Sequence, residues 1–198
     1  MATAATRGAR VHLELGGKAP CLVFEDADLA AAAHGIAMGA TYNSGQDCTA
    51  ATRVYAHESV FDELVERIAA QFNSIRVGDP RSTDTDIGPL ISVEHRDRVH
   101  GFVERAVAAG ATVHAGGEIP DGPGGAYYPP TLLTGAAQSS EIVQDEVFGP
   151  VLVALPFRTE QEAIALANDS AYGLASSVWT VDGGARGLRV AHAMEAGG

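Results

Sequence analysis

Hydrophobic positions along this chain recur with two periods, and each period predicts a different kind of element. Short apolar runs rich in β-branched residues predict strands, which we place at residues 11–15, 20–24, 53–56, 111–115, 131–134, 150–156 and 176–180. Longer stretches with apolar residues spaced by three and four predict helices, which we place at residues 29–40, 61–75, 93–109, 160–167 and 184–196. This alternation predicts an α/β fold with a largely parallel sheet flanked by helices.

Local signals sharpen several of these boundaries. Asp28 and Ser59 each precede an apolar-periodic stretch, and we expect both to cap helices, because short polar side chains accept hydrogen bonds from the first free amides. Gly110 is a natural stop for the helix before it. Polar or Gly- and Pro-rich stretches predict loops at residues 43–49, 78–89 and 116–130.

Composition narrows the class of protein. A chain of 198 residues suits one domain, and its net charge of −12 disfavours nucleic acid as a partner, because like charges repel. No apolar run approaches the ~20 residues that cross a bilayer, and the first ten residues do not resemble a secretory signal. The two cysteines form neither a disulfide framework nor a metal-binding pair, so we expect no metal and a reducing, cytoplasmic location.

The two cysteines lie in different surroundings. Cys21 lies within an apolar strand, where a small buried hydrophobe is the expected role. Cys48 lies in a polar loop after a helix, close to Gly45, which allows unusual backbone angles and close approach of a ligand. The local sequence leaves two roles open for Cys48, a reactive nucleophile and a packing residue. None of the seven histidines falls in a thiol-protease signature.

Glu14 is a candidate catalytic carboxylate. It lies at the end of the predicted strand 11–15 and is followed by Gly16 and Gly17, which allow a tight turn. A carboxylate held at a strand end can act as a general base. The alternative is an ordinary strand residue that faces solvent.

Four short segments together resemble the NAD(P)-dependent aldehyde dehydrogenase superfamily. They are LELGGK at residues 13–18, NSGQDC at 43–48, GPL at 88–90 and EVFGPV at 146–151. Each is moderately specific alone, whereas all four in this order on one α/β pattern are highly specific. The resemblance covers the chain from about residue 8 to its end.

The resemblance implies a mechanism and a set of site residues. Cys48 is then the nucleophile that attacks the aldehyde, and its backbone amide is one oxyanion donor. The thiohemiacetal gives a hydride to NAD or NADP, and Glu14 activates the water that hydrolyses the thioester. Glu146 resembles the residue that holds the nicotinamide ribose, and Phe148 resembles the aromatic beside the nicotinamide. Lys18 matches the motif in a supporting role.

The same resemblance predicts what residues 1–198 do not contain. In the family a cofactor-binding domain precedes the Glu14 segment, and a C-terminal segment supplies the oligomerisation arm. We recognise neither in this sequence, and therefore expect the cysteine-bearing catalytic domain alone, truncated at both ends. The family forms homo-oligomers, and we expect the isolated chain to be weak or inactive as a dehydrogenase.

The substrate class is indicated by the residues around the nucleophile. The segment GQDCTA at residues 45–50 is most similar to the branch that acts on 4-aminobutyraldehyde and related amino-aldehydes. Asp47 beside the nucleophile is suited to attract a cationic amine. The alternative is that Asp47 has only a structural role.

Two other functions stay open from the sequence. One is a cofactor-independent thiol esterase that uses Cys48 and Glu14 alone. The other is a non-catalytic fragment that associates with a full-length subunit, since an unpaired sheet edge tends to recruit another strand.

Overall fold

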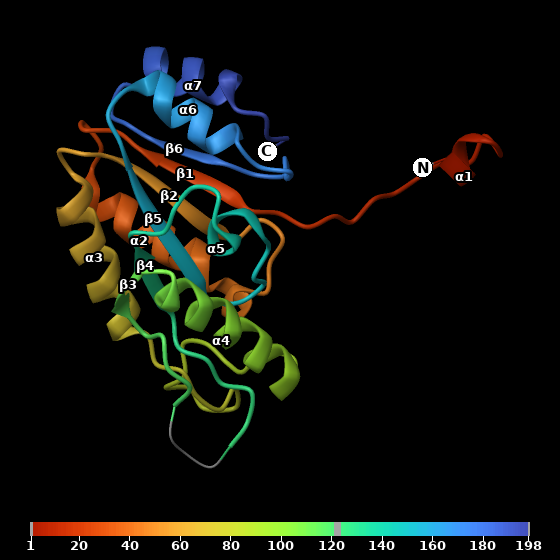
Figure 1. Ribbon diagram of the computed structural model, residues 1–198, viewed down its shortest axis with the longest axis vertical. Helices are drawn as coiled ribbons and strands as arrows, with labels where there is room; N and C mark the ends of the chain where they lie inside the picture. The colour runs from red at the N-terminus through yellow and green to blue at the C-terminus, as the bar shows by residue number, and fades with distance from the viewer. Residues whose placement is uncertain (1, 121–123, 198) are drawn as a thin grey trace.

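A six-stranded sheet runs through the centre of the computed structural model, which describes residues 2–120 and 124–197 (Figure 1). Its strand order is β3-β4-β5-β2-β1-β6, and β3 alone is antiparallel to its neighbour. The strands are β1 (Ala19–Val23), β2 (Ala51–His57), β3 (Thr112–Ala115), β4 (Thr131–Thr134), β5 (Val151–Phe157) and β6 (Ser177–Trp179). The predicted α/β fold with a largely parallel sheet is therefore confirmed.

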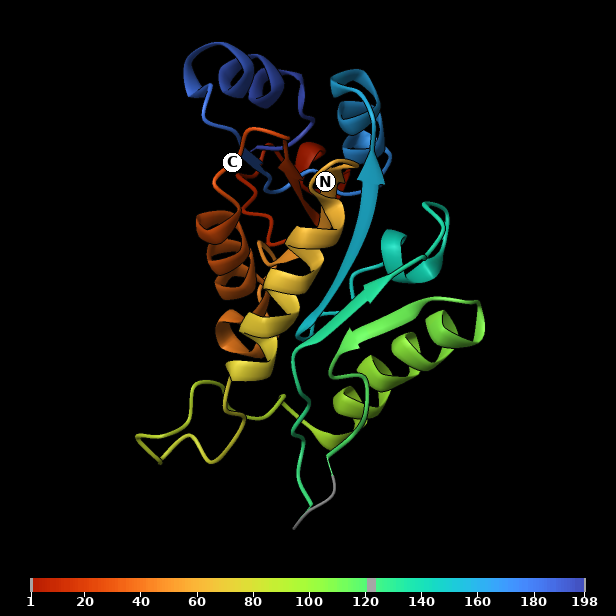
Figure 2. The same cartoon turned by 90° about the vertical axis from the view of Figure 1, so that its left-hand side faces the viewer.

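Helices cover both faces of the sheet (Figure 2). On one face α2 (Leu29–Thr41) and α3 (Phe61–Ser74) enclose a core to which Val54 and Leu152 contribute. The other core contains Tyr55 and Val153, together with residues of α4 (Val93–Ala108), α5 (Glu141–Gln144), α6 (Glu160–Asn168) and α7 (Leu188–Ala193). Successive residues of one strand thus enter opposite cores, which explains why the strands read as continuous apolar runs.

Most predicted elements appear within two residues of their expected bounds. Asp28 caps α2 as predicted, with its Oδ1 accepting hydrogen bonds from two backbone amides of the first turn at 3.0 Å. Gly110 follows α4 with a φ of +101° and ends it. Within the described ranges, no helix is long and apolar enough to span a membrane. Part of the predicted loop at residues 116–130, namely residues 121–123, lies outside the described residues.

The predicted strand at residues 11–15 is wrong. These residues are exposed and irregular, in an arm that runs from the short helix α1 (Ala2–Ala5) to β1 (Figure 1). Alternation of side chains does not suffice for a strand, which needs a neighbour for its backbone hydrogen bonds. Because β2 and β6 flank β1 on both sides, the arm has no place beside β1 in the sheet.

Two further predictions need correction. Ser59 does not cap α3; the cap position is Val60, and the Ser59 hydroxyl instead contacts Nδ1 of His57 at 2.8 Å. The helix predicted at residues 184–196 begins as a wide π turn, Gly183–Gly187, and continues as α7 only to Ala193. Three glycines in the π turn weaken regular helix formation there. The short helix α5 was not predicted.

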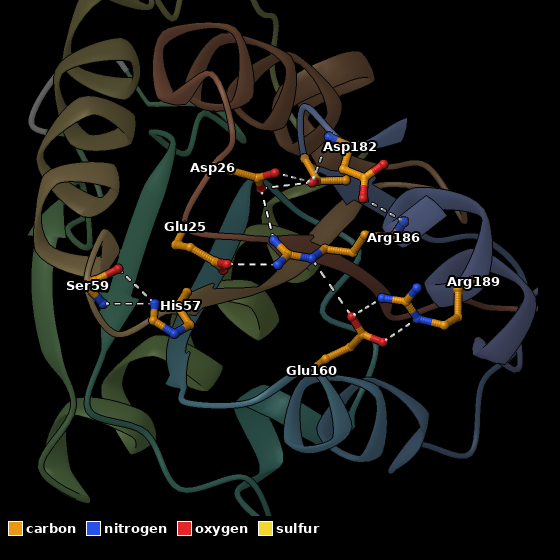
Figure 3. A network of polar contacts seen from close by, with 9 residues as sticks. Glu25, Asp26, His57, Ser59, Glu160, Asp182, Arg186 and Arg189 are labelled. Atoms are coloured by element: carbon orange, nitrogen blue, oxygen red, sulfur yellow. Dashed lines mark hydrogen bonds and ion pairs between the residues drawn. The ribbon is translucent and has the colours of Figure 1, made fainter. Parts of the chain in front are cut away.

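Arg186, in the π turn, fastens the C-terminal part of the chain to the carboxyl ends of the strands (Figure 3). Its guanidinium contacts Glu25 at 2.9 Å and Asp26 at 3.1 Å, two and three residues after the end of β1. Glu160 at the start of α6 pairs with Arg189 at 2.8 Å and lies 3.9 Å from Arg186. A network of this kind is more stabilising than isolated surface pairs.

Arg53 of β2 is a buried cation at the opposite end of the sheet. Its Nε donates to the Lys18 carbonyl at 2.8 Å, and its Nη2 donates to the Ala167 carbonyl at 2.9 Å. Its Nη1 donates to the Tyr55 hydroxyl at 3.1 Å and more weakly to the Leu166 carbonyl. The last carbonyls of α6 carry partial negative charge, which partly compensates the buried guanidinium. Arg53 thereby ties the segment before β1 to α6.

Lys18, the chain's single lysine, lies beside Arg53 and is 2% exposed. Burial, together with the positive charge of Arg53, lowers the pKa of the Lys18 ammonium from 10.5 to about 7, although Asp145 and Glu146 act in the opposite direction. Folding therefore favours the neutral amine. The unfolded chain binds more protons than the folded chain between these two pKa values, so Lys18 makes stability rise with pH across that window.

Replacing Arg53 with Met is expected to lower the free energy of unfolding by about 3 kcal/mol or more, because several buried carbonyls lose their donor. Urea denaturation measures the change. Arg67→Met is the matched control, since Arg67 makes an exposed pair with Glu63 on α3 that is worth at most about 0.5 kcal/mol. Equal costs for the two substitutions would contradict the role assigned to Arg53.

A second prediction concerns Lys18. Because no other lysine is present, ¹³C-lysine labelling gives one side-chain resonance, and its titration midpoint is expected near 7 rather than near 10.5. In urea denaturation at a series of pH values, the free energy of unfolding is expected to rise less above pH 7 in Lys18→Met than in the unsubstituted chain. A midpoint close to 10.5, or an unchanged pH slope in the variant, would contradict the view that the buried Lys18 makes stability depend on pH.

Candidate active site around Cys48

Cys48 lies in a tight loop between α2 and β2, and its side chain is partly exposed. Three successive residues of this loop are left-handed, Asn43 with φ +49°, Ser44 with φ +58° and Gly45 with φ +72°. Left-handed backbone is costly for residues with a side chain and persists where surrounding contacts enforce it. Here the side-chain amide of Asn43 donates to the backbone carbonyl of Gln46 at 2.9 Å. The side-chain amide of Gln46 donates in return to the backbone carbonyl of Asn43 at 3.1 Å.

Residues 88–91 hold the loop from one side. The Ser44 hydroxyl donates to the Gly88 carbonyl at 2.8 Å, and the Ile91 amide donates to Oε1 of Gln46 at 2.8 Å. The GPL segment is therefore a neighbour of the cysteine loop, although about forty residues separate them in the sequence.

Residues 149–150 hold the loop by backbone contact alone. A Cβ on Gly45 would overlap the carbonyl group of Gly149 and the nitrogen of Pro150, and its positive φ disfavours any other residue as well. Only glycine fits this close approach. The EVFGPV segment therefore lies directly against the loop that carries Cys48.

Gly17 joins the segment at residues 13–18 to the segments at residues 43–48 and 146–151. A Cβ at Gly17 would overlap the carbonyl oxygen of Cys48, so the two backbones are in direct contact. The Gly17 amide also donates to Oε1 of Glu146 at 2.8 Å. Gly17 thus lies between the predicted nucleophile and the predicted ribose-binding carboxylate.

Three of the four segments meet because of the strand order. Residues 13–18 precede β1, residues 43–48 precede β2 and residues 146–150 precede β5, and these three strands are neighbours in the sheet. Parallel strands begin at the same edge, so the segments that precede them gather there. Cys48, Glu146 and the 37% exposed Phe148 are therefore all at the amino edge of the sheet.

Glu14 is not brought to Cys48 in this arrangement. Its side chain is 80% exposed in the N-terminal arm, and the only hydrogen bond that its carboxylate makes within the described part of the chain is with His12. Its role as the base stays a prediction.

Asp47 has a local partner. Its Oδ1 accepts hydrogen bonds from the Thr49 amide and the Thr49 hydroxyl, each at 3.0 Å. The carboxylate therefore stabilises the turn that contains Cys48, which is the structural alternative considered above. A role in attracting a cationic substrate stays a prediction.

Cys21 behaves as expected for a packing residue. It is 3% exposed in β1, and burial raises the pKa of its thiol to about 11. The thiolate is the reactive form of a cysteine, so Cys21 is inert at neutral pH.

Sequence reasoning missed three residues that support the site. Arg53 buttresses the segment that contains Lys18, and its signal was an arginine within an otherwise apolar strand. His95 and Arg98 of α4 contact the main chain of residues 146–148. Their signal was a spacing of three, which places both on one face of the helix.

Comparison with known proteins agrees with this geometry. The model of the aldehyde dehydrogenase family matches residues 1–198. The 3,6-anhydro-alpha-L-galactose dehydrogenase of Streptomyces coelicolor is 43% identical, over 98% of this chain and 42% of its own length. The betaine aldehyde dehydrogenase of Brucella anthropi is 41% identical, over 100% of this chain and 41% of its own length.

A solved structure extends the likeness to three dimensions. The betaine aldehyde dehydrogenase of Staphylococcus aureus in complex with NAD+ superposes with a TM-score of 0.93 at 40% identity, covering 99% of this chain and 39% of that protein. The chain thus spans about two fifths of the length of the relatives that it matches. With the family's motif segments assembled around Cys48, these matches show that the chain belongs to the aldehyde dehydrogenase family.

Proposed function

We propose that this chain carries the nucleophile and the nicotinamide-side contacts of an enzyme that oxidises an aldehyde to a carboxylic acid with NAD+ or NADP+. The observation that carries the proposal is the convergence of the other three motif segments on the Cys48 loop, through the contacts of Gly17, Gly45 and Ser44. Because the chain spans about two fifths of its relatives, the activity of the whole protein is part of the proposal.

In the proposed reaction the Cys48 thiolate forms a bond to the aldehyde carbon, and the carbonyl π bond breaks to give the oxyanion of a thiohemiacetal. The Cys48 amide stabilises the oxyanion. Loss of a hydride from that carbon leaves a thioester, which water hydrolyses to the acid and the free thiol. Covalent catalysis divides one difficult oxidation into two easier steps. When bound, the oxidised nicotinamide supplies the hydride acceptor.

The residues present fit the nicotinamide side of such a cofactor. One oxygen of Glu146 accepts from the Gly17 amide, and the other has no hydrogen bond within residues 2–120 and 124–197, so the carboxylate can accept ribose hydroxyls. The neighbouring Phe148 is 37% exposed, and its ring offers a flat apolar surface. NAD+ is bound in the Staphylococcus aureus relative, which supports NAD+ for this chain.

Glu14 is the proposed base for hydrolysis of the thioester. Its exposed position in the N-terminal arm means that the arm must approach Cys48 before it can act. We therefore expect attack by Cys48 to be faster than release of the acid in this chain.

The proposed substrate class is an aldehyde that carries a cationic nitrogen. Betaine aldehyde dehydrogenases are among the relatives, and betaine aldehyde contains a quaternary ammonium group. The charge of Asp47 next to Cys48 favours such a substrate over a neutral one. The cytoplasmic location and the homo-oligomeric assembly expected from the resemblance stay predictions.

Covalent trapping tests the first step. With p-nitrophenyl acetate we expect a burst of about one equivalent of p-nitrophenolate per chain and an acetyl group on Cys48 by mass spectrometry, followed by slower turnover. Cys48→Ala is expected to lose the burst, and Cys21→Ala, the matched thiol control, to keep it. A burst that survives in Cys48→Ala would refute the assignment of the nucleophile.

The same readout separates a dehydrogenase from an esterase. An aldehyde is expected to leave an acyl group on Cys48 only when NAD+ or NADP+ is present, with one equivalent of reduced cofactor formed. Acylation by the ester, but never by an aldehyde with either cofactor, would favour the esterase.

A further inference from the structure

Phe148 has a strained backbone that its own sequence does not explain. Its φ of +59° is left-handed, a conformation that costs an aromatic residue free energy and persists where neighbours over-determine it. The residue after it is Gly149, which contacts the Cys48 loop through Gly45. Something must therefore hold residues 146–149 in this conformation.

The N-terminal half of α4 provides the restraint. His95 Nε2 donates to the Phe148 carbonyl at 2.7 Å; a carbonyl oxygen only accepts, so this nitrogen carries the proton. Arg98 donates from Nη1 to the Val147 carbonyl at 2.9 Å and from Nη2 to the Glu146 carbonyl at 3.2 Å. Three consecutive carbonyls are thus bound by two side chains of one helix.

This helix is a rigid support. Ser92 caps it by accepting a hydrogen bond from the His95 amide at 3.1 Å. Val99 and Phe102 on the same helix are buried in the core, and the Arg98 guanidinium stacks 4.9 Å from the centre of the Phe102 ring. Stacking and packing fix the rotamer of Arg98, so little entropy is lost when its fork binds the carbonyls.

We propose that His95 and Arg98 are positioning residues that clamp residues 146–149, and that through the Gly149–Gly45 contact they also set the position of the Cys48 loop. They act on main-chain carbonyls. That the clamp serves catalysis rests on the proposed function, whereas the mechanical coupling to the Cys48 loop does not.

The variants separate the clamp from general stability. His95→Leu removes the donor to Phe148, and His95→Gln keeps an amide donor of similar reach. Arg98→Met keeps an apolar stem over Phe102 without the fork. Arg105→Met is the matched control, because Arg105 lies on the same helix and stacks 5.1 Å from the same ring, yet it bonds Glu141 instead of residues 146–148.

Two readouts follow the segment and the loop. The first is amide hydrogen exchange of residues 44–50 and 146–151, and the second is the alkylation rate of Cys48, with buried Cys21 as internal reference. We expect His95→Leu and Arg98→Met each to speed exchange of both segments roughly tenfold and to change the alkylation rate severalfold. His95→Gln and Arg105→Met are expected to stay close to the unsubstituted chain.

Several results would overturn the clamp. They are exchange and alkylation within twofold of the unsubstituted chain in both His95→Leu and Arg98→Met, equal effects in Arg105→Met, or failure of His95→Gln to restore the behaviour lost in His95→Leu. The test is independent of turnover. If the chain neither binds cofactor nor forms an acyl group on Cys48, the proposed function fails while the exchange data still decide the clamp.

Discussion

The structure depends on close approach of main chains at the amino edge of the sheet. The backbone of Gly17 touches the carbonyl of Cys48, and the backbone of Gly45 touches that of Gly149, with no room for a side chain at either contact. The strands that follow these segments, β1, β2 and β5, are adjacent. Sheet order and glycine contacts therefore impose one geometry: a cysteine loop held between a carboxylate-bearing segment and a glycine turn.

The buried guanidinium of Arg53 also supports this edge of the sheet. Arg53 binds the Lys18 carbonyl and the end of α6, so the residue after Gly17 is anchored to α6. The neighbouring Lys18 ammonium is poorly tolerated there, and its lowered pKa records that cost. At the opposite edge the partly buried ion-pair network around Arg186 holds the C-terminal turn, so the two ends of the sheet are secured by different means.

Much of the fold followed from the sequence because strands and helices here obey their own periodicities. Two of the errors share one cause, the need for a tertiary partner. Residues 11–15 alternate as a strand does but have no neighbouring strand. Ser59 has the side chain of a helix cap, but its hydroxyl contacts His57 and not the first amides of α3. The motifs identified Cys48, Glu146 and Phe148 as site candidates, yet the roles of His95 and Arg98 depend on contacts across about fifty residues, which local patterns do not contain.

The central proposal is that Glu146 binds the nicotinamide ribose and Phe148 lies beside the nicotinamide, next to Cys48. Oxidised nicotinamide mononucleotide tests it, since it contains the nicotinamide and its ribose but lacks the adenylate half. The measurement is the alkylation rate of Cys48 against nucleotide concentration, in the unsubstituted chain and in Glu146→Ala. We expect saturable protection of Cys48 in the unsubstituted chain, and protection severalfold weaker in Glu146→Ala. An alkylation rate that millimolar nucleotide leaves unchanged in the unsubstituted chain would contradict it.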